Sequence, residues 1–427
     1  MTGRTSNLLD QAAPEKSAAG AETASRARRL RVASVCTLFP TDAEPHKGIF
    51  VARRVSHVAQ IADVRAIQPI PWFPLLRPVR ATSPASGCLA PAPEQPRMFY
   101  LPGALKRLDG KWLARSIEPL LRRWRDEGGL DLVDAHFGYP EGVGAVLAAG
   151  RLGIPVFATL RGNEQVYLRQ PAIRGQLLDA LQRCHGVVAV SRRLCDAVCD
   201  AGVDREKVRV IPNAVDRRLF SPSDQGAARA ALGLPAESPV IVSVGQLVRG
   251  KGHDVLVRAV HRLRFKHPDV VLAIVGGASY ERDWPRSLES LIASLDMKGT
   301  VRLAGARPPD EVARWLCAGD VFGLCTEREG CCNSVLEALA CGRPVVTTAA
   351  GDNAVYVVPS ENGYIVAHDD VDAVCSALDA ALTREWDSGR ISGSLPRDGW
   401  DGVARRVVEF FSERLHRDSC GSPAPGA

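Results

Sequence analysis

No stretch of this 427-residue sequence approaches the ~20 apolar residues that a membrane-spanning helix requires. The first stretch, residues 1–24, also lacks the apolar core of a signal peptide and is rich in Ala, Ser, Thr and Gly. We therefore predict a disordered leader over residues 1–29 and a cytoplasmic protein. Without a spanning segment, any attachment to the inner face of a membrane is expected to be peripheral.

Twelve cysteines are spread over the chain, yet none of them forms a Cys-x-x-Cys pair. The sequence therefore lacks the motif of a zinc ribbon and that of a thioredoxin-type redox site. Cys331 and Cys332 are adjacent, and Cys195 and Cys199 stand one helical turn apart, a spacing that core packing explains more simply than a metal. Reduced thiols in a reducing compartment are the expected state.

Aromatic residues are few, 6% of the chain, and charge is unevenly distributed. Residues 1–215 contain 30 Lys and Arg against 20 Asp and Glu, whereas residues 216–427 contain 24 against 28. The basic cluster in the first half fits a solvated face and a patch for anionic lipid head groups about equally. Few aromatic residues lie near it, so nucleic-acid binding is not expected. The cluster comprises Arg77, Arg80, Lys106, Arg107, Lys111, Arg115, Arg122, Arg123 and Arg125.

The chain has 46% apolar and 24% charged residues, which predicts folded domains, and its length favours two or three of them. Short apolar runs alternate with amphipathic stretches, a pattern typical of parallel sheets covered by helices on both faces. The alternation stops around Pro212 and then restarts. We therefore predict two doubly wound units, with a cleft where the carboxyl ends of their sheets face each other.

The expected elements and domains can be placed by residue number. Strands are expected at 30–38, 130–135, 156–160, 187–190, 208–211, 240–244, 270–275, 301–304, 321–324, 344–347 and 364–366. Helices are expected at 50–61, 141–152, 171–184, 192–201, 253–265, 284–295, 308–318, 334–340, 371–382 and 402–415. The proline-dense residues 68–103 predict a long irregular insertion. The domains are placed at 30–215 and 216–396, followed by a C-terminal helix at 397–416 that can cross back to the first domain and a flexible tail at 417–427.

The segment Gly245–Gly252 reads GQLVRGKG, directly after an expected strand and before an expected helix. It departs from the P-loop pattern at Gly252, where a hydroxyl residue for Mg²⁺ is required, so a P-loop NTPase is not expected. Glycines let a backbone approach an anion, Arg249 and Lys251 add positive charge, and a helix start offers N–H groups. These features predict a phosphate site; the alternative is a plain tight turn.

Glu329 and Glu337 belong to the segment EREGCCNSVLEALA (327–340), the first in an expected loop and the second in an expected helix. Carboxylates so placed can accept hydrogen bonds from vicinal hydroxyls of a sugar or ribose. Asn333 and Ser334 are expected at the N-cap, so that the following N–H groups, beginning with Val335, can receive a diphosphate. The alternative is an acidic helix start followed by a solvent-facing Glu.

Two further patterns have simpler explanations. Asp370-Val371-Asp372 fits the DxD motif that holds Mn²⁺ in other transferases, but it opens an expected helix, which N-capping by Asp370 explains. The stretch GVG (142–144) lacks the third glycine of the dinucleotide fingerprint and does not follow a strand. Neither a metal nor a nicotinamide cofactor is therefore expected.

Taken together, these segments resemble the retaining glycosyltransferases of family 4, which include many bacterial exopolysaccharide and lipid-linked glycan enzymes. The resemblance implies the GT-B fold, an α/β architecture of two Rossmann-like domains facing across a cleft. EGCCNSVLEALACGRPVV (329–346) is its most specific part. The other matching segments are FPTDAEPHKGIFVARRV (39–55), DAHFGYPEG (134–142), TLRGNE (159–164), VIPNAVD (210–216), VGQLVRGKGHDVL (244–256) and ENGYIV (361–366).

The resemblance implies roles for the residues of the donor site. Glu329 is implied to contact hydroxyls of the donor sugar, Glu337 the ribose of the nucleotide, and Lys251 the diphosphate. Gly245 opens the loop that carries Lys251, and Gly48 is implied to lie in the N-terminal loop that faces the phosphates.

The first domain is implied to supply the acceptor side. His136, at the end of an expected strand, matches the position that approaches the reacting sugar, although a lone His is more often structural. Arg161 and Glu164 of TLRGNE are implied to lie on the acceptor side, where Arg161 is suited to an anionic acceptor group.

Three positions depart from the family pattern. Gln246 replaces the Arg that usually follows the first Gly of the donor loop, and Arg249 is as suited to supply that charge as to be a bystander. The segment GDNAV (351–355) occupies the place of the common GGxxE motif but lacks its Glu, which leaves sugar selectivity open. Asn163 and Glu164 stand where a small residue and an Asp are more usual.

The resemblance implies transfer of a sugar from a nucleotide diphosphate donor to a glycan or lipid-linked acceptor, with retention of anomeric configuration and without a metal. Exopolysaccharide or cell-surface glycan synthesis is the expected setting. Two alternatives stay open: a sugar-nucleotide epimerase or hydrolase, and a non-catalytic protein of GT-B type that binds nucleotide sugar or acts as a scaffold. Turnover with and without an acceptor distinguishes the three.

Overall fold

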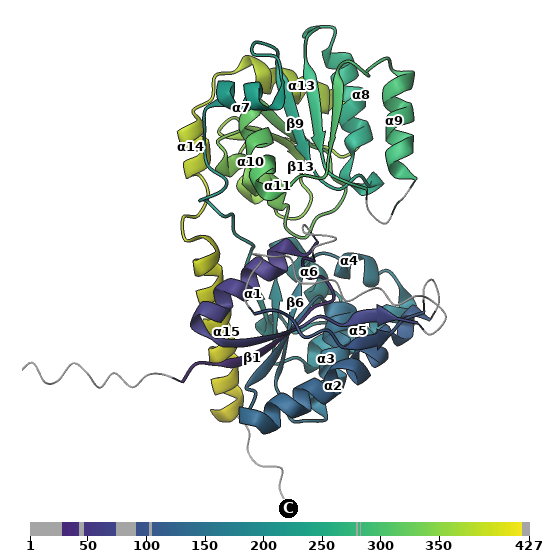
Figure 1. Ribbon diagram of the computed structural model, residues 1–427, viewed down its shortest axis with the longest axis vertical. Coiled ribbons are helices and arrows are strands. Elements are labelled where there is room, and N and C mark those ends of the chain that lie inside the picture. Colours follow the sequence, from purple (N-terminus) through teal and green to yellow (C-terminus); the bar gives the residue numbers. More distant parts are fainter. Residues whose placement is uncertain are drawn as a thin grey trace, which may run out of the picture.

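The computed structural model describes residues 28–41, 47–73, 91–101, 105–278, 281 and 283–420. Two α/β domains are stacked end to end, with the first domain in purple to teal and the second in green (Figure 1). The described residues of each domain form a six-stranded sheet in which every strand pair is parallel, with helices on both faces. The predicted fold class, two doubly wound Rossmann-like domains, is confirmed.

The sheet of the first domain has the order β2-β1-β5-β6-β7-β8. All residues of its central strands β5 and β6 are buried, as expected for strands that helices cover on both faces. In register, Val133 lies opposite Val156 and His136 opposite Thr159. The strands are β1 (Arg31–Val35), β2 (Asp63–Ile67), β5 (Leu132–His136), β6 (Val156–Leu160), β7 (Gly186–Ala189) and β8 (Val208–Val210).

The sheet of the second domain has the order β11-β10-β9-β12-β13-β14. In both domains the chain order reverses beside a central strand, β1 or β9, which creates the switch point where doubly wound folds bind ligands. The strands are β9 (Val240–Val244), β10 (Val271–Val275), β11 (Val301–Gly305), β12 (Val321–Leu324), β13 (Val345–Thr348) and β14 (Gly363–Val366).

The helices alternate with these strands along the chain. The first domain has α1 (Ile49–Ile61), α2 (Asp109–Gly128), α3 (Val143–Gly150), α4 (Glu164–Tyr167), α5 (Pro171–Arg183) and α6 (Arg192–Asp200). The second has α7 (Gln225–Leu232), α8 (His253–Leu263), α9 (Trp284–Ser294), α10 (Pro309–Ala318), α11 (Asn333–Ala340), α12 (Asn353–Tyr356), α13 (Val371–Thr383) and α14 (Ser388–Gly393). Short turns η1 (Lys106–Leu108), η2 (Gly138–Gly142), η3 (Arg205–Lys207) and η4 (Arg249–Lys251) complete them.

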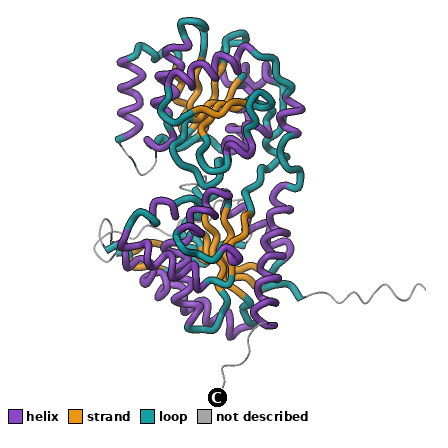
Figure 2. Tube along the Cα trace, turned by 180° about the vertical axis from the view of Figure 1, so that it is seen from behind, coloured by secondary structure: helices purple, strands orange, loops and turns teal. Residues whose placement is uncertain are grey.

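The last helix, α15 (Gly399–Cys420), runs from the second domain down the side of the first (Figures 1 and 2). Val407, Phe410 and Phe411 pack in one buried cluster with Val58 of α1 and Phe157 of β6. His57 of α1 also contacts Asp401 at 2.7 Å. The end of the chain thus belongs to the core of the first domain, because its apolar face completes that core.

Several expectations about local structure were wrong. Within the predicted irregular insertion, β3 (Ile70–Trp72) and β4 (Arg97–Phe99) form a two-stranded parallel pair; residues 74–90 lie outside the described part. A two-stranded pair tolerates its prolines because not every N–H is needed in a ladder. The expected 141–152 helix is split into η2 and α3. Strand β2 and helices α2, α4, α7, α12 and α14 were not predicted.

The two chain ends also differ from the prediction where they are described. Arg28, assigned to the disordered leader, contacts Asp131 at 3.0 Å, and Arg29 donates a hydrogen bond to the carbonyl of Ala59. Helix α15 continues to Cys420, four residues into the predicted flexible region. The rest of the predicted leader, residues 1–27, and of the tail, residues 421–427, lies outside the described residues, as do Arg77 and Arg80.

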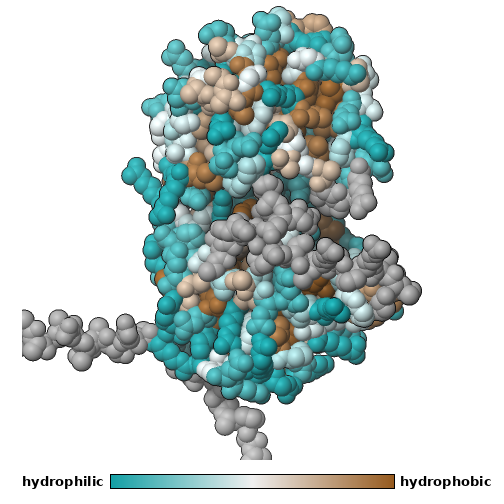
Figure 3. All heavy atoms as spheres, in the orientation of Figure 1, coloured by the Kyte–Doolittle hydropathy of each residue, from teal (hydrophilic) through white to brown (hydrophobic). Residues whose placement is uncertain are grey.

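The surface mixes hydrophilic and hydrophobic residues on the visible face of both domains (Figure 3). Among the described residues, no helix combines the length and the apolar character needed to cross a bilayer. The described members of the basic cluster lie mainly on η1 and α2 of the first domain.

Candidate functional site

The loops that follow the carboxyl ends of strands in the two sheets contact one another across the domain boundary. Gly162, after β6, lies against Gly330, after β12, so closely that a Cβ on Gly330 would overlap the carbonyl of Arg161. Asn213, after β8, donates a hydrogen bond of 3.0 Å to Asn333 Oδ1 at the start of α11. The candidate site is therefore a junction of both domains, as the sequence predicts for a doubly wound pair.

The donor loop between β9 and α8 folds tightly because glycines permit it. Gly245 follows β9, and the Gly276 Cα lies so close that a Cβ there would overlap the Gly245 carbonyl. Gly252 caps α8 with φ of 66° and leaves no room for a Cβ beside the carbonyl of Cys325. This close approach, which only glycine allows, brings Lys251 to the end of β12.

Lys251 and Glu329, which the resemblance assigns to one donor molecule, contact each other. Lys251 Nζ lies 2.5 Å from Glu329 Oε1, and Thr326 Oγ1 donates to the same oxygen at 3.1 Å. Both side chains are partly accessible, Lys251 at 23% and Glu329 at 10%. The cation and the carboxylate therefore stabilise each other while each retains an exposed side.

Arg249 has a partner within its own domain. Its guanidinium lies over the ring of Trp284 at 4.8 Å from the centroid, and its backbone N–H donates to Glu281 at 2.9 Å. The position of Arg249 thus favours a role in holding the donor loop to α9 over the role of the Arg that Gln246 replaces.

Helix α11 begins one residue earlier than expected. Its N-cap is Cys332, with no capping hydrogen bond from a side chain, so the prediction that Asn333 and Ser334 cap the helix was wrong. Both residues lie in its first turn instead, because Cys332 has φ and ψ of −79° and 89°, outside the helix. The N–H groups of Asn333 and Ser334 consequently lie at the open start of the helix, whereas that of Val335 interacts with the Cys332 thiol.

Glu337 is partly buried one turn further along α11, and burial raises its pKa to about 7. Arg53 of α1, in the first domain, lowers this pKa in part. Gly48 caps α1 with φ of 67°, and a Cβ there would overlap the carbonyl of Leu38. The start of α1 is thus held close to β1, while residues 42–46 lie outside the described part.

His136, at the carboxyl end of β5, is fully buried in a network of polar side chains. Arg161 donates to its Nδ1 at 3.2 Å, so its ring proton lies on Nε2, facing Ser34 Oγ at 3.0 Å and Asp134 at 3.4 Å. Burial, with Arg161 and Arg54, holds the pKa of His136 well below its ordinary value. His136 is therefore a neutral imidazole that orients Arg161.

Arg161 connects this buried network with the second domain. Its Nη1 donates to Asn213 Oδ1 at 3.2 Å, and Asn213 in turn contacts Asn333 of α11. Burial, reinforced by Arg54, lowers the pKa of Arg161 to about 9. Its Nε is buried and has no hydrogen-bond partner. Arg161 is thus positioned at the boundary with one polar atom left unsatisfied.

Glu164 is placed for support. Its carboxylate accepts hydrogen bonds from the backbone N–H groups of Gly138 and Gly162 at 2.8 Å and of Arg161 at 3.1 Å, and its side chain is fully buried. All three donors belong to the backbone of η2 or of the loop after β6, so Glu164 shapes the loop that presents Arg161. The expectation that it faces the acceptor is not what this geometry favours.

Asp352, in the altered GGxxE segment, joins the domains at a second point. Its carboxylate accepts hydrogen bonds from the N–H groups of Arg192 at 2.7 Å and Arg193 at 3.3 Å, at the start of α6. Arg193 also donates to the carbonyl of Ala349. Sequence reasoning missed Asp352 as an interdomain contact, because an acid in a loop shows no sign of its distant partner.

The DxD-like segment is a helix cap. Asp370 accepts a hydrogen bond of 2.9 Å from the N–H of Ala373 and caps α13, which confirms the simpler explanation. Within the described ranges, no group of three or more His, Cys, Asp or Glu side chains is arranged to hold a metal ion.

Comparisons with known proteins agree with this geometry. Residues 46–219 match the family model described as Glycosyltransferase Family 4, and residues 224–392 match that described as Glycosyl transferases group 1. D-inositol 3-phosphate glycosyltransferase of Acidothermus cellulolyticus is 30% identical over 311 residues, which cover 68% of this chain and 69% of the relative. The chain belongs to the family 4 and group 1 glycosyltransferases.

Another curated relative supports this assignment, and two solved structures share the fold. The D-inositol 3-phosphate glycosyltransferase of Stackebrandtia nassauensis is 32% identical, over 68% of this chain and 70% of its own. Sucrose-phosphate synthase of Thermosynechococcus elongatus superposes with a TM-score of 0.72 at 20% identity, covering 91% of this chain and 100% of that one. Anabaena HepE in complex with UDP and glucose has a TM-score of 0.67 at 19% identity, over 92% and 100%. The two relatives are named for an inositol phosphate, not for exopolysaccharide.

Proposed function

We propose that this glycosyltransferase moves a sugar from a nucleoside diphosphate sugar, bound by the second domain, to an acceptor bound by the first. The pairing of Lys251 with Glu329 beside Cys332, the uncapped start of α11, carries the proposal. A cation and helix N–H groups suit a diphosphate, and a carboxylate suits sugar hydroxyls. Glu337, one turn along the same helix, is placed to accept hydrogen bonds from a ribose.

In the free protein, Lys251 and Glu329 each occupy the place that a group of the donor takes when it binds. When the donor binds, the sugar hydroxyls take the place of Lys251 on Glu329, and the diphosphate takes the place of Glu329 on Lys251. The pair keeps both charges compensated in the free protein. Glu329 also keeps its hydrogen bond from Thr326, which holds the carboxylate in position during the exchange.

The chemical demand of the transfer falls on the leaving group. As the bond between the sugar and the diphosphate breaks, negative charge grows on the diphosphate, and Lys251 with the N–H groups of Asn333 and Ser334 stabilises it. One such preorganised group contributes about 3 kcal/mol, or a hundredfold in rate. These groups supply the charge stabilisation in a transfer that needs no metal and retains the anomeric configuration. No carboxylate is assigned as nucleophile.

The neutral state of His136 limits its role. With its pKa well below the ordinary value, it has no proton to donate as an imidazolium. It instead positions Arg161, whose charge and place at the boundary suit an anionic acceptor. Glycan or lipid-linked acceptors of cell-surface or exopolysaccharide synthesis fit this requirement when they carry phosphate or uronic acid. The basic α2 then lies against an anionic membrane surface.

The names of the two relatives favour a second acceptor class, a phosphorylated polyol such as D-inositol 3-phosphate. The same Arg161 would receive its phosphate. Both candidates share an anionic acceptor and differ in whether an apolar carrier follows the phosphate.

Turnover followed by NMR tests the proposal. UDP-, GDP- and ADP-glucose and their N-acetylglucosamine and mannose counterparts are supplied with D-inositol 3-phosphate or with a prenyl diphosphate-linked sugar. We expect acceptor-dependent release of one nucleoside diphosphate and a product with the donor's anomeric configuration, both lost in Glu329→Gln. Inversion would contradict retention, and release independent of every acceptor would support a hydrolase.

A further inference from the structure

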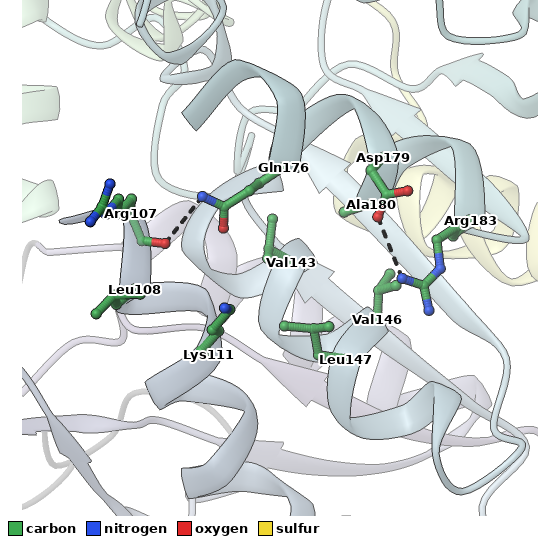
Figure 4. A pocket seen from close by; sticks show the side chains of 10 residues that line it. All are labelled: Arg107, Leu108, Lys111, Val143, Val146, Leu147, Gln176, Asp179, Ala180 and Arg183. Atoms are coloured by element: carbon green, nitrogen blue, oxygen red, sulfur yellow. Dashed lines mark hydrogen bonds and ion pairs between the residues drawn. The ribbon is translucent and has the colours of Figure 1, made fainter. Parts of the chain in front are cut away.

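The first domain contains a pocket of 520 Å³ outside the domain boundary. It lies between η1, the first turn of α2, the outer side of α3 and helix α5 (Figure 4). This volume falls within the ~300–1,000 Å³ of typical small-molecule sites. None of the residues assigned to donor or acceptor in the proposed function lines it, so it requires an explanation of its own.

The floor of the pocket is apolar because α3 is apolar on every side. Its sequence, VGAVLAAG, packs one side tightly against α2, where a Cβ on Gly110 would overlap Val143. Val143, Val146 and Leu147 line the pocket beside this contact, on the part of α3 that lies between α2 and α5. Gln176 of α5 donates to the carbonyl of Arg107 at 3.1 Å and closes one wall.

The rim of the pocket carries more positive than negative charge. Arg107, Lys111 and Arg183 line it, against the single carboxylate of Asp179. Asp179 pairs with Arg183 at 3.4 Å, at the opposite end of the pocket from Arg107 (Figure 4). In the part of the chain that the structure describes, no ion pair involves Arg107 or Lys111. One end of an apolar pocket thus has two cations without a carboxylate partner.

The cationic end is the end nearer to the catalytic boundary. Lys106, next to Arg107, accepts a hydrogen bond through its carbonyl from the Tyr139 hydroxyl of η2. Turn η2 directly follows Phe137 and His136 at the carboxyl end of β5, and leads into Val143 of the pocket floor. Arg183 ends α5, which leads to the start of β7, so Arg183 lies at the amino ends of the strands, away from the domain boundary.

We infer that this pocket binds a single-chain amphiphile with a phosphate head, the head at Arg107 and Lys111 and the apolar tail along Val143, Val146 and Leu147. The inference rests on the proposed function in one respect: it identifies the acceptor as a sugar carried on such a lipid phosphate, whose phosphate is held by Arg107 and Lys111 in place of Arg161. The head then lies at the side of the pocket from which the attached sugar reaches the boundary. A phosphorylated polyol has no tail to fill the apolar floor.

Equilibrium binding to the full-length protein tests the pocket without any donor. The probes are farnesyl phosphate below its critical micelle concentration, farnesol, which lacks the head, and inorganic phosphate, which lacks the tail. We expect a micromolar Kd for farnesyl phosphate and at least tenfold weaker binding of the other two. Equal binding of farnesol would overturn the role of the cations, and no binding of farnesyl phosphate would overturn the inference.

Three variants separate the pocket from a charged surface. Lys111→Ala removes a cation of the pocket, and Leu147→Trp fills its floor; each is expected to weaken farnesyl phosphate at least tenfold. Arg115→Ala removes an exposed cation of α2 that does not line the pocket, and is expected to change the Kd less than twofold. Equal losses in Lys111→Ala and Arg115→Ala, or binding only to phosphatidylglycerol vesicles, would show a membrane-surface patch and contradict the inference.

Thermal unfolding of each variant controls for folding, and Lys111→Ala keeps the test valid if Leu147→Trp is unstable, because Lys111 is exposed. Nucleoside diphosphate binding, measured on the same samples, is expected to be unchanged in all three variants. If the wild type binds the nucleoside diphosphate but not farnesyl phosphate, only the inference about the pocket is overturned. Intact farnesyl phosphate binding with no nucleotide binding overturns the proposed function and leaves the pocket standing.

Discussion

Both domains bring charged side chains to their common boundary, but they hold them differently. In the first domain, Arg54, Asp134, His136 and Arg161 are at most 8% exposed and contact one another. In the second, Lys251 remains 23% exposed and pairs with Glu329 across a contact that a ligand can replace. The first network is therefore held mainly by contacts among its own members, whereas we propose that the substrate completes the second.

The comparison separates stability from function. A buried network has no spare partners in water, so the loss of one member leaves another charge uncompensated. A partly exposed pair can exchange its partner, so the loss of one member affects ligand binding more than folding. The predictions below change one side of this comparison at a time.

The largest effect is expected from Asp134→Asn. This change leaves the guanidinium of Arg54, which lies 3.2 Å from Asp134, and that of Arg161 buried without a carboxylate between them. We expect a loss of about 3–5 kcal/mol in the free energy of unfolding, measured by urea titration. Asp196→Asn, which breaks a solvent-exposed pair with Arg205, is the control and is expected to cost less than about 1 kcal/mol. Equal losses would remove the distinction.

Lys251→Ala is expected to lower turnover about a hundredfold, since it removes the cation that stabilises the leaving diphosphate. Its unfolding midpoint is expected to stay within a few degrees of the wild type. Arg249→Ala, in the same turn, serves as the control, because the Arg249 side chain stacks on Trp284. Steady-state release of nucleoside diphosphate measures both variants. A larger loss in Arg249→Ala would assign the missing family charge to Arg249.

The two domains each contain a carboxyl group whose pKa burial raises to about 7, Glu141 in the first and Glu337 in the second. If ionised Glu337 accepts hydrogen bonds from the ribose, nucleotide affinity rises about tenfold from pH 6 to pH 8. Glu337→Gln is expected to abolish this rise in nucleotide affinity, and Glu141→Gln to retain it. Calorimetry at several pH values measures both variants. Identical pH profiles for the two variants would contradict the role of Glu337.

The same pKa shifts have a consequence for stability. Because folding raises these pKa values, the folded state binds more protons than the unfolded state between about pH 4.5 and pH 7. Stability therefore falls as pH rises through this range, and each Gln variant is expected to reduce that fall.

The smallest effect is expected at the contact between the domains. Asp352→Ala removes the hydrogen bonds at the start of α6 and is expected to cost about 1 kcal/mol. Asp224→Ala removes the comparable cap of α7, which lies within the second domain. We expect similar losses of stability but a larger radius of gyration only in Asp352→Ala, by small-angle scattering. Equal radii would show that Asp352 does not help hold the domains together.

The sequence predicted the strands of the second domain better than those of the first. Strands β9 and β12 begin and end where expected, because their continuous apolar runs are bounded by clear turn signals. Helix α2 was missed although Leu113, Ile117, Leu121 and Trp124 recur at helical spacing and are buried. Its many arginines suggested a surface patch, and the internal Pro119 is unusual in a helix.

The sequence indicated the residues of the candidate site, but not the contacts between them. Local motifs indicate Lys251 and Glu329, since glycines and an adjoining helix determine the chemistry there. They do not show that Asn213 meets Asn333, or that Glu164 turns toward the backbone of its own loop. Such contacts depend on how distant segments pack against one another. A single sequence has no local pattern that indicates this packing.

Calorimetric titration of UDP, GDP and ADP tests the account most directly, because the donor site in the second domain is its central claim. The wild type is compared with Lys251→Ala and Glu337→Gln. We expect one of the three diphosphates to bind at micromolar affinity and both substitutions to weaken it at least tenfold, about 1.4 kcal/mol. Failure of all three to bind the folded wild type, or equal affinity in both variants, would contradict the account.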